Sequence, residues 1–168
     1  MSIIYLENRP KVLRVDVNQC TSCQSCVMAC SLKKEGVFSP FKSRINILSD
    51  ESRCFNVPNI CEHCESPPCV PVCPTNAITK NNENGIVKID MELCIGCGKC
   101  SEACPFDSIK IRNEKAHKCD LCNGDPECVK VCYAYALQYV EKQPATIREK
   151  ERLADERIRS IKTVRGVD

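Results

Sequence analysis

The chain has 168 residues, 17 cysteines, no tryptophan and a formal net charge of +2. This length allows one compact domain or two small ones, and the nearly balanced charge excludes the basic footprint of a nucleic-acid-binding protein. A cysteine content this high has three common explanations, which are disulfides, zinc sites and iron–sulfur clusters.

The ends and the apolar runs of the chain give no sign of export or membrane insertion. The opening residues MSIIYLENRPKVLRVDV contain no basic segment followed by an apolar run, so no secretory signal is expected. No stretch approaches the ~18 apolar residues of a membrane span. We therefore expect a cytoplasmic protein, in a reducing compartment where structural disulfides are rare.

Short runs rich in valine and isoleucine predict β-strands. In chain order they cover residues 12–17, 44–48, 85–90, 108–111 and 136–140. Cysteine-rich segments lie between them, and each ends in a C-x3-C step that places two cysteines on one face of a helical turn. Each unit is therefore expected to run as strand, cysteine loop, short helix and strand.

Sixteen of the cysteines fall into four motifs with similar spacing. The motifs are Cys20, Cys23, Cys26 and Cys30; Cys61, Cys64, Cys69 and Cys73; Cys94, Cys97, Cys100 and Cys104; and Cys119, Cys122, Cys128 and Cys132. The last three motifs run into similar segments, CPTNAI, CPFDSI and CYAYAL. Such self-similarity indicates a repeated structural unit. Cys54 belongs to no motif.

The spacing favours iron–sulfur clusters over zinc. The first and third motifs read C-x2-C-x2-C-x3-C, in which three thiolates bind one [4Fe-4S] cluster and the fourth binds another. Cys94, Cys97 and Cys100 are thus expected to hold one cluster, and Cys104 to help hold a different one. The alternative is four structural zinc sites with four thiolates each, although zinc ribbons usually separate their two C-x2-C pairs by a longer span.

The four motifs, with the widened second and fourth members CEHCESPPCVPVCP and CDLCNGDPECVKVC, resemble those of four-cluster polyferredoxin subunits. That family includes the electron-transfer subunits of dimethyl sulfoxide reductase, formate dehydrogenase and hydrogenase complexes. Similar small subunits serve tungsten enzymes of the aldehyde oxidoreductase family, such as tungsten-type benzoyl-CoA reductase. The resemblance covers roughly residues 10–140 and implies four [4Fe-4S] clusters.

The resemblance also implies which cysteines share a cluster, because in that family the first motif pairs with the fourth and the second with the third. The implied sets are Cys20, Cys23, Cys26 and Cys132; Cys30, Cys119, Cys122 and Cys128; Cys61, Cys64, Cys69 and Cys104; and Cys73, Cys94, Cys97 and Cys100. Spacing alone leaves the pairing open, since joining first with second and third with fourth also satisfies every cysteine. The first motif lacks the usual proline after its last cysteine, and the fourth has Tyr133 there, so both short helices are expected to end differently.

The expected fold is α+β, with two ferredoxin-like modules, one inserted in the other, and a C-terminal helical tail. Residues 10–52 with 113–140 would form the outer module, 53–112 the inserted module and 141–168 the tail.

The tail has no cysteine and carries many charges of both signs. Thr146 and Glu149 match a capping box at a helix start. Apolar residues recur near one helical face, namely Ile147, Leu153, Ala154, Ile158, Ile161 and Val164. We expect this stripe to dock on a partner subunit; packing on the chain's own surface is the alternative.

Other residues near the motifs have less specific roles. His63 and His117 are not expected to be ligands, because every motif is already complete. Lys99, Lys115 and Lys118 either offset the negative charge of thiolate-bound clusters or are ordinary solvated lysines.

No P-loop, G-x-G-x-x-G fingerprint or nucleophile–base pair is present, so the chain is not expected to be an enzyme. We expect an electron-transfer subunit between a catalytic oxidoreductase subunit and a second redox partner or ferredoxin. A tungsten or molybdenum pterin enzyme of anaerobic metabolism is favoured as the catalytic subunit, ahead of a hydrogenase. A free-standing soluble polyferredoxin is the alternative.

Overall fold

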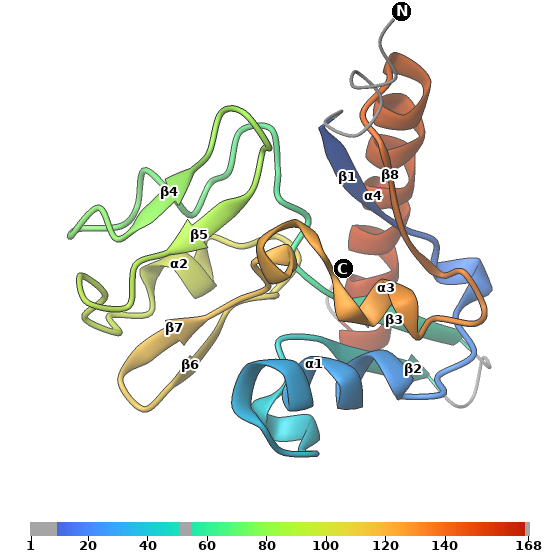
Figure 1. Cartoon of the computed structure of the whole chain (residues 1–168), viewed down its shortest axis with the longest axis horizontal. Coiled ribbons are helices and arrows are strands. Elements are labelled where there is room, and N and C mark those ends of the chain that lie inside the picture. Colours follow the sequence, from blue (N-terminus) through green and yellow to red (C-terminus); the bar gives the residue numbers. More distant parts are fainter. Residues whose placement is uncertain (1–9, 51–54, 167–168) are drawn as a thin grey trace, which may run out of the picture.

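The computed structural model describes residues 10–50 and 55–166 (Figure 1). Within these ranges the chain forms four antiparallel sheets of two strands each. The pairs are β1 (Lys11–Val15) with β8 (Leu137–Glu141), β2 (Asn46–Asp50) with β3 (Phe55–Asn59), β4 (Ile78–Lys80) with β5 (Val87–Ile89), and β6 (Lys110–Arg112) with β7 (Lys115–His117). No described helix is both long enough and apolar enough to cross a membrane.

Pairing of β1 with β8 joins the two ends of the cysteine-rich region. Leu13 and Val15 alternate with Arg14 and are buried, and Val15 lies opposite Leu137 of β8. This period-2 alternation gives the small sheet one apolar face. That face joins a core that also contains buried cysteines of three motifs, Cys26, Cys30, Cys61, Cys119 and Cys128.

Three of the four C-x3-C steps lie on or beside helices: α1 (Ser25–Glu35), α2 (Lys99–Glu102) and α3 (Glu127–Lys130). Because no proline follows Cys30, α1 continues to Glu35 and is capped by Gly36, whose backbone is left-handed and whose amide donates to the Leu32 carbonyl at 2.9 Å. The second motif forms turns in place of the expected helix, and the Cys73 amide donates to the Val70 carbonyl at 3.2 Å.

All five predicted strand segments overlap a strand, but β3, β4 and β7 were not predicted. The expected module boundaries, after residues 52 and 112, fall between the paired strands β2 and β3 and between β6 and β7. In Figure 1, β4 to β7 and α2 gather on one side, while β1 and β8 lie on the other side. The small mixed fold with a C-terminal helix agrees with the expected class, and the nesting of two modules stays a prediction.

The tail forms one long helix, α4 (Pro144–Arg165). It begins earlier than the capping box was expected to place it: Thr146 is its third helical residue, and its hydroxyl accepts from the Gln143 amide at 2.8 Å. Glu149 instead pairs with Arg14 of β1, with 2.6 Å between the guanidinium and the carboxylate.

The apolar stripe of α4 packs on the chain itself, unlike the expectation that it faces a partner. Leu153 and Ile161 are buried, and Ile161 belongs to a core cluster with Val17, Val57 and Phe106 from three other segments. The apolar side chains of these short segments are covered by α4, which explains the difference. Most of the exposed residues of α4 are charged.

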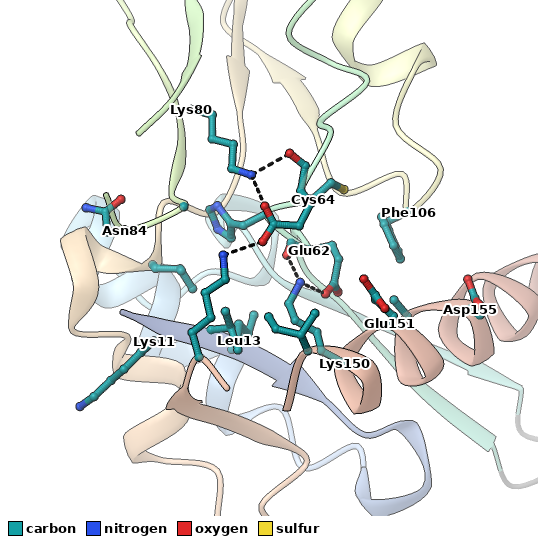
Figure 2. Close-up of a pocket in the computed structure, with 18 of the residues that line it drawn as sticks. Lys11, Leu13, Glu62, Cys64, Lys80, Asn84, Phe106, Lys150, Glu151 and Asp155 are labelled. Carbon is teal, nitrogen blue, oxygen red and sulfur yellow. Dashed lines mark hydrogen bonds and ion pairs between the residues drawn. The ribbon is translucent and has the colours of Figure 1, made fainter. Parts of the chain in front are cut away.

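A buried ion pair fixes α4 against the second motif. Arg157 of α4 is fully buried, pairs with Glu62 and lies 4.5 Å from the centre of the Phe106 ring. Lys150, about two turns earlier on α4, pairs with the same carboxylate. Its ammonium group also donates to the backbone carbonyl of Glu62 at 2.9 Å (Figure 2). Since Glu62 follows Cys61 directly, α4 holds the loop of the second motif in place.

Candidate functional site

The motif cysteines are all described, and all of them are free thiols. Only Cys23 and Cys97 among them are exposed, and the others are buried or half-buried. Cys54 lies outside the described residues. Free thiols concentrated in the interior are the donor set that a buried iron–sulfur cluster requires.

The last cysteine of the fourth motif lies with the first motif. The pKa of the Cys26 thiol is raised to about 12, chiefly by burial and in addition by the neighbouring Cys20 and Cys132. The pKa of Cys20 is also raised, first by burial and then by Cys132 and Cys23, against a hydrogen bond from the Ser22 backbone. The structure therefore brings Cys132 together with the first three cysteines of the first motif.

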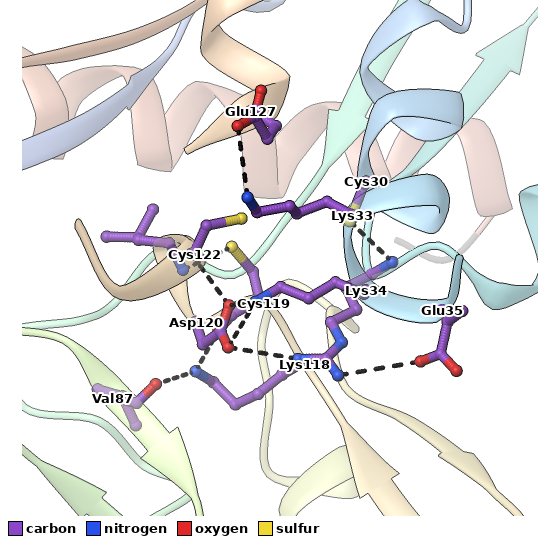
Figure 3. Close-up of polar contacts among 12 residues, drawn as sticks. Cys30, Lys33, Lys34, Glu35, Val87, Lys118, Cys119, Asp120, Cys122 and Glu127 are labelled. Atoms are coloured by element: carbon purple, nitrogen blue, oxygen red, sulfur yellow. Dashed lines mark hydrogen bonds and ion pairs between the residues drawn. The ribbon is translucent and has the colours of Figure 1, made fainter. Parts of the chain in front are cut away.

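Conversely, the last cysteine of the first motif lies with the fourth motif. Burial strongly raises the pKa of Cys128, and its sulfur neighbours Cys119, Cys30, Cys26 and Cys122 add to the rise. Figure 3 shows Cys30 on α1 across from Cys119 and Cys122. Cys30 thus lies among the first three cysteines of the fourth motif.

The second and third motifs are arranged in the same way, with the last cysteine of each lying beside the other motif. Burial raises the pKa of Cys69 to about 11, with Cys61, Cys104 and Cys64 adding to the rise and Lys118 opposing it. Burial likewise raises the pKa of Cys64, where Cys104 is again one of the neighbours that add to the rise. Cys104 therefore lies with the second motif. Conversely, one small cavity is lined by Cys73, Cys94, Cys97 and Cys100.

These four groups of sulfur atoms form a row. Cys61 of one group lies close enough to Cys119 of the next to add to the rise in the pKa of Cys119, and Cys26 adds in the same way to the rise in the pKa of Cys128. The remaining two groups are joined through the chain itself. Cys104 belongs to one of them and Cys100 to the other, and both cysteines are in the third motif. Cys23 and Cys97, the two exposed cysteines, belong to the two end groups.

Backbone amides point at several of the sulfur atoms. The distances from amide nitrogen to sulfur are 3.3 to 3.4 Å, and the pairs are Arg44 to Cys30, Ala116 to Cys94, Leu121 to Cys119, and Leu137 to Cys132. Hydrogen bonds from N–H groups stabilise a thiolate and, at a bound cluster, influence its potential. The donor set thus fits iron–sulfur clusters.

No group of three or more His, Cys, Asp or Glu side chains in the described ranges is arranged to hold a single metal ion. The sulfur groups described above are therefore considered as sites for a cluster of several irons. That each group holds one stays a prediction.

Gly96 in the third motif allows its loop to approach the β6–β7 turn. Its φ is +66°, and a Cβ there would overlap the carbonyl oxygen of Glu114. Gly98 has a φ of +84° but open space around the corresponding position. We expect Gly96→Ala to lose the cluster held by the third motif, because backbone atoms of two segments would collide.

Gly98→Ala is the matched control for this substitution. It carries only the cost of a left-handed alanine, about 1–2 kcal/mol, and should retain the cluster. Iron analysis and the visible absorbance of the two purified variants measure the difference. Equal iron content in both variants would contradict the close approach at Gly96.

The chain matches the 4Fe-4S dicluster domain family over residues 52–142. An uncharacterized ferredoxin of Methanocaldococcus jannaschii is 37% identical, over 86% of this chain and 81% of that protein. The polyferredoxin-like subunit of an aliphatic sulfonate oxidoreductase from Pyrococcus furiosus is 40% identical, over 69% of this chain and 68% of that protein.

A solved structure shows a weak similarity. It is the active site complex BamBC of benzoyl coenzyme A reductase with benzoyl-CoA, with a TM-score of 0.46 and 27% identity over 86% of this chain and 89% of that chain. Other relatives are described as an electron transport protein and as subunits of reductases and dehydrogenases. These descriptions confirm the expectation of an electron carrier that is not itself catalytic.

Proposed function

Because the chain belongs to the 4Fe-4S dicluster domain family, we propose that it is the electron-transfer subunit of an oxidoreductase complex, with four [4Fe-4S] clusters in one row. The observation that carries this proposal is the row of four sulfur groups with one exposed cysteine at each end. Each cluster, when bound, supplies one-electron chemistry at a potential set by its surroundings.

The proposed ligand sets follow the crossed pairing, with the first motif joined to the fourth and the second to the third. The outer module, residues 10–52 with 113–140, would hold two clusters, and the inserted module, residues 53–112, would hold the other two. Pairing of β1 with β8 and the proximity of Cys132 to Cys20 support the outer module. The cysteines of the two middle groups are all buried or half-buried, whereas each end group has one exposed cysteine.

Both ends of the row carry exposed apolar or aromatic side chains. Ile95, with 62% of its surface exposed, lies between Cys94 and Cys97 at one end. At the other end, Tyr133 is 65% exposed, and its hydroxyl is hydrogen-bonded to that of Thr21 at 2.8 Å. Exposed aromatic and aliphatic groups of this kind are common at the centre of protein interfaces. We propose that one redox partner docks at each end.

The proposed catalytic partner is a tungsten or molybdenum pterin enzyme, with a hydrogenase as the next candidate, and the second partner is a ferredoxin or another redox protein. The description of the Pyrococcus relative as a subunit of an oxidoreductase supports a catalytic partner. The metal of that partner is proposed from the motif resemblance. A free-standing carrier is the second candidate, because the Methanocaldococcus relative is described as a ferredoxin.

Anaerobic co-purification tests the proposed role. A tagged chain expressed in its own host is expected to elute with a larger subunit that contains tungsten or molybdenum, as measured by elemental analysis of the complex. Elution of the chain alone, with its iron intact, would favour the free-standing carrier. Elution with a larger subunit that contains nickel would favour the hydrogenase.

A further inference from the structure

Lys118 is a buried lysine in the middle of the row of sulfur groups. Only 3% of its surface is exposed, and it immediately precedes Cys119. Its ammonium group donates to the carbonyl oxygen of Val87 and, at 2.7 Å, to that of Cys119 (Figure 3). Among the described residues no carboxylate forms an ion pair with Lys118, whereas Lys34 nearby pairs with Asp120 at 2.7 Å.

An ammonium group without a counter-ion is costly to bury, and two carbonyl oxygens offset only part of that cost. Cysteines of two different sulfur groups lie within reach of its charge, and one of them, Cys119, also accepts from it through its carbonyl. Burial raises the pKa of Cys69 to about 11 and that of Cys119 to about 12, and the charge of Lys118 opposes the rise in both. Lys118 therefore lies where the two central groups of the row meet.

Val87 of β5 holds Lys118 and a second side chain at this junction. Its amide donates to Nδ1 of His63 at 3.0 Å, while its carbonyl accepts from Lys118. Since Nδ1 is an acceptor, the neutral imidazole carries its proton on Nε2, which is buried and has no hydrogen-bond partner in the described part of the chain. Two buried polar groups thus lie beside the central sulfur groups, and both lack a full set of partners.

We propose that Lys118 influences electron flow through its charge. Its positive charge raises the reduction potentials of the two central clusters relative to those of the two end clusters. This inference rests on the proposed function, since it requires four clusters. A reduced cluster carries one more negative charge than an oxidised one, so a fixed positive charge nearby favours the reduced form. The effect is strong at this place because water, which would screen the charge, is excluded.

The test is a redox titration of the full-length protein followed by electron paramagnetic resonance. In Lys118→Gln, which keeps a hydrogen-bond donor and removes the charge, two of the four midpoint potentials are expected to fall and the other two to stay unchanged. Lys118→Arg keeps the charge and should retain all four potentials. Lys130→Gln is the matched control. Lys130 also lies close to motif cysteines in the sequence, between Cys128 and Cys132, but its side chain is 47% exposed and paired with Asp125 and Glu127.

Four unchanged potentials in Lys118→Gln, with full iron content, would overturn the inference. Loss of iron from Lys118→Gln but not from Lys118→Arg would also overturn it, because Lys118 would then be a residue needed for assembly. Failure of the proposed function itself is recognised separately: the unsubstituted protein would then hold fewer than four reducible clusters.

Discussion

Cys104→Ser is expected to disrupt the cluster held with Cys61, Cys64 and Cys69, although Cys104 belongs to the motif of Cys100. The reason is that Cys104 lies close to two cysteines of the second motif, because it adds to the rise in the pKa of both Cys64 and Cys69. A serine oxygen is a harder and poorer ligand for iron–sulfur clusters than a thiolate. The variant should lose up to about four of about sixteen irons, measured by anaerobic iron analysis.

Cys100→Ser is the matched control, only four positions away. It should disrupt the cluster at the Cys97 end of the row and leave the one near Cys64 in place. Mössbauer spectra and redox titrations of both variants distinguish the two losses, since different clusters disappear. The same cluster missing from both variants would show that the third motif holds a cluster alone, and the crossed pairing would be wrong.

Glu62→Ala is expected to be the most destabilising substitution outside the cysteines. It would leave the guanidinium of Arg157 buried without its carboxylate, since that side chain is fully buried and its Nε and Nη1 atoms already lack partners. Breaking a buried ion pair by removing one partner typically costs about 3–5 kcal/mol. The cluster beside Glu62 should therefore bleach at lower denaturant concentration, as followed by visible absorbance.

Removal of both charges should be less harmful than removal of one. The double variant Glu62→Gln with Arg157→Met fills similar volume without an unpaired guanidinium, so part of the stability should return. Lys130→Gln, at an exposed and paired lysine, is expected to change the midpoint little. A double variant as unstable as the sum of its two single variants would contradict direct coupling between Glu62 and Arg157.

The motif spacing was enough to predict the class of fold and free thiols in its interior, although the second motif forms turns where a short helix was expected. It was not enough for the strands that the hydrophobic pattern missed. Strand β3 contains Pro58, and β7 has three residues, of which two are Lys115 and His117. Such strands exist because a partner strand lies beside them, and that partner is set by tertiary structure.

The role of α4 shows a second limit of sequence reasoning. Its apolar stripe was visible in the sequence, but a stripe does not say which surface will cover it. The structure adds Arg157, a charged residue within the stripe whose buried partner Glu62 lies far away in the chain. A docking role for the tail, which stays a prediction, would have to use the exposed charged face of α4.

The burial of Lys118 and the hydrogen bonds from backbone amides to sulfur atoms could not be predicted from the sequence either. A lysine is usually exposed, whereas this one is buried where the fourth motif meets Val87 of β5. The amide of Ala116 reaches the sulfur of Cys94 across 22 positions of sequence. Such contacts depend on how the strands and loops fold around the sulfur groups.

The most direct test of the proposed electron-transfer role is the iron, sulfide and zinc content of the anaerobically purified full-length protein. Four clusters in a row predict about sixteen irons and about sixteen acid-labile sulfides per chain, with no zinc. About eight irons would mean that only two of the four sulfur groups hold clusters. About four zinc ions with no sulfide would contradict the account, because the thiolates would then be structural zinc ligands.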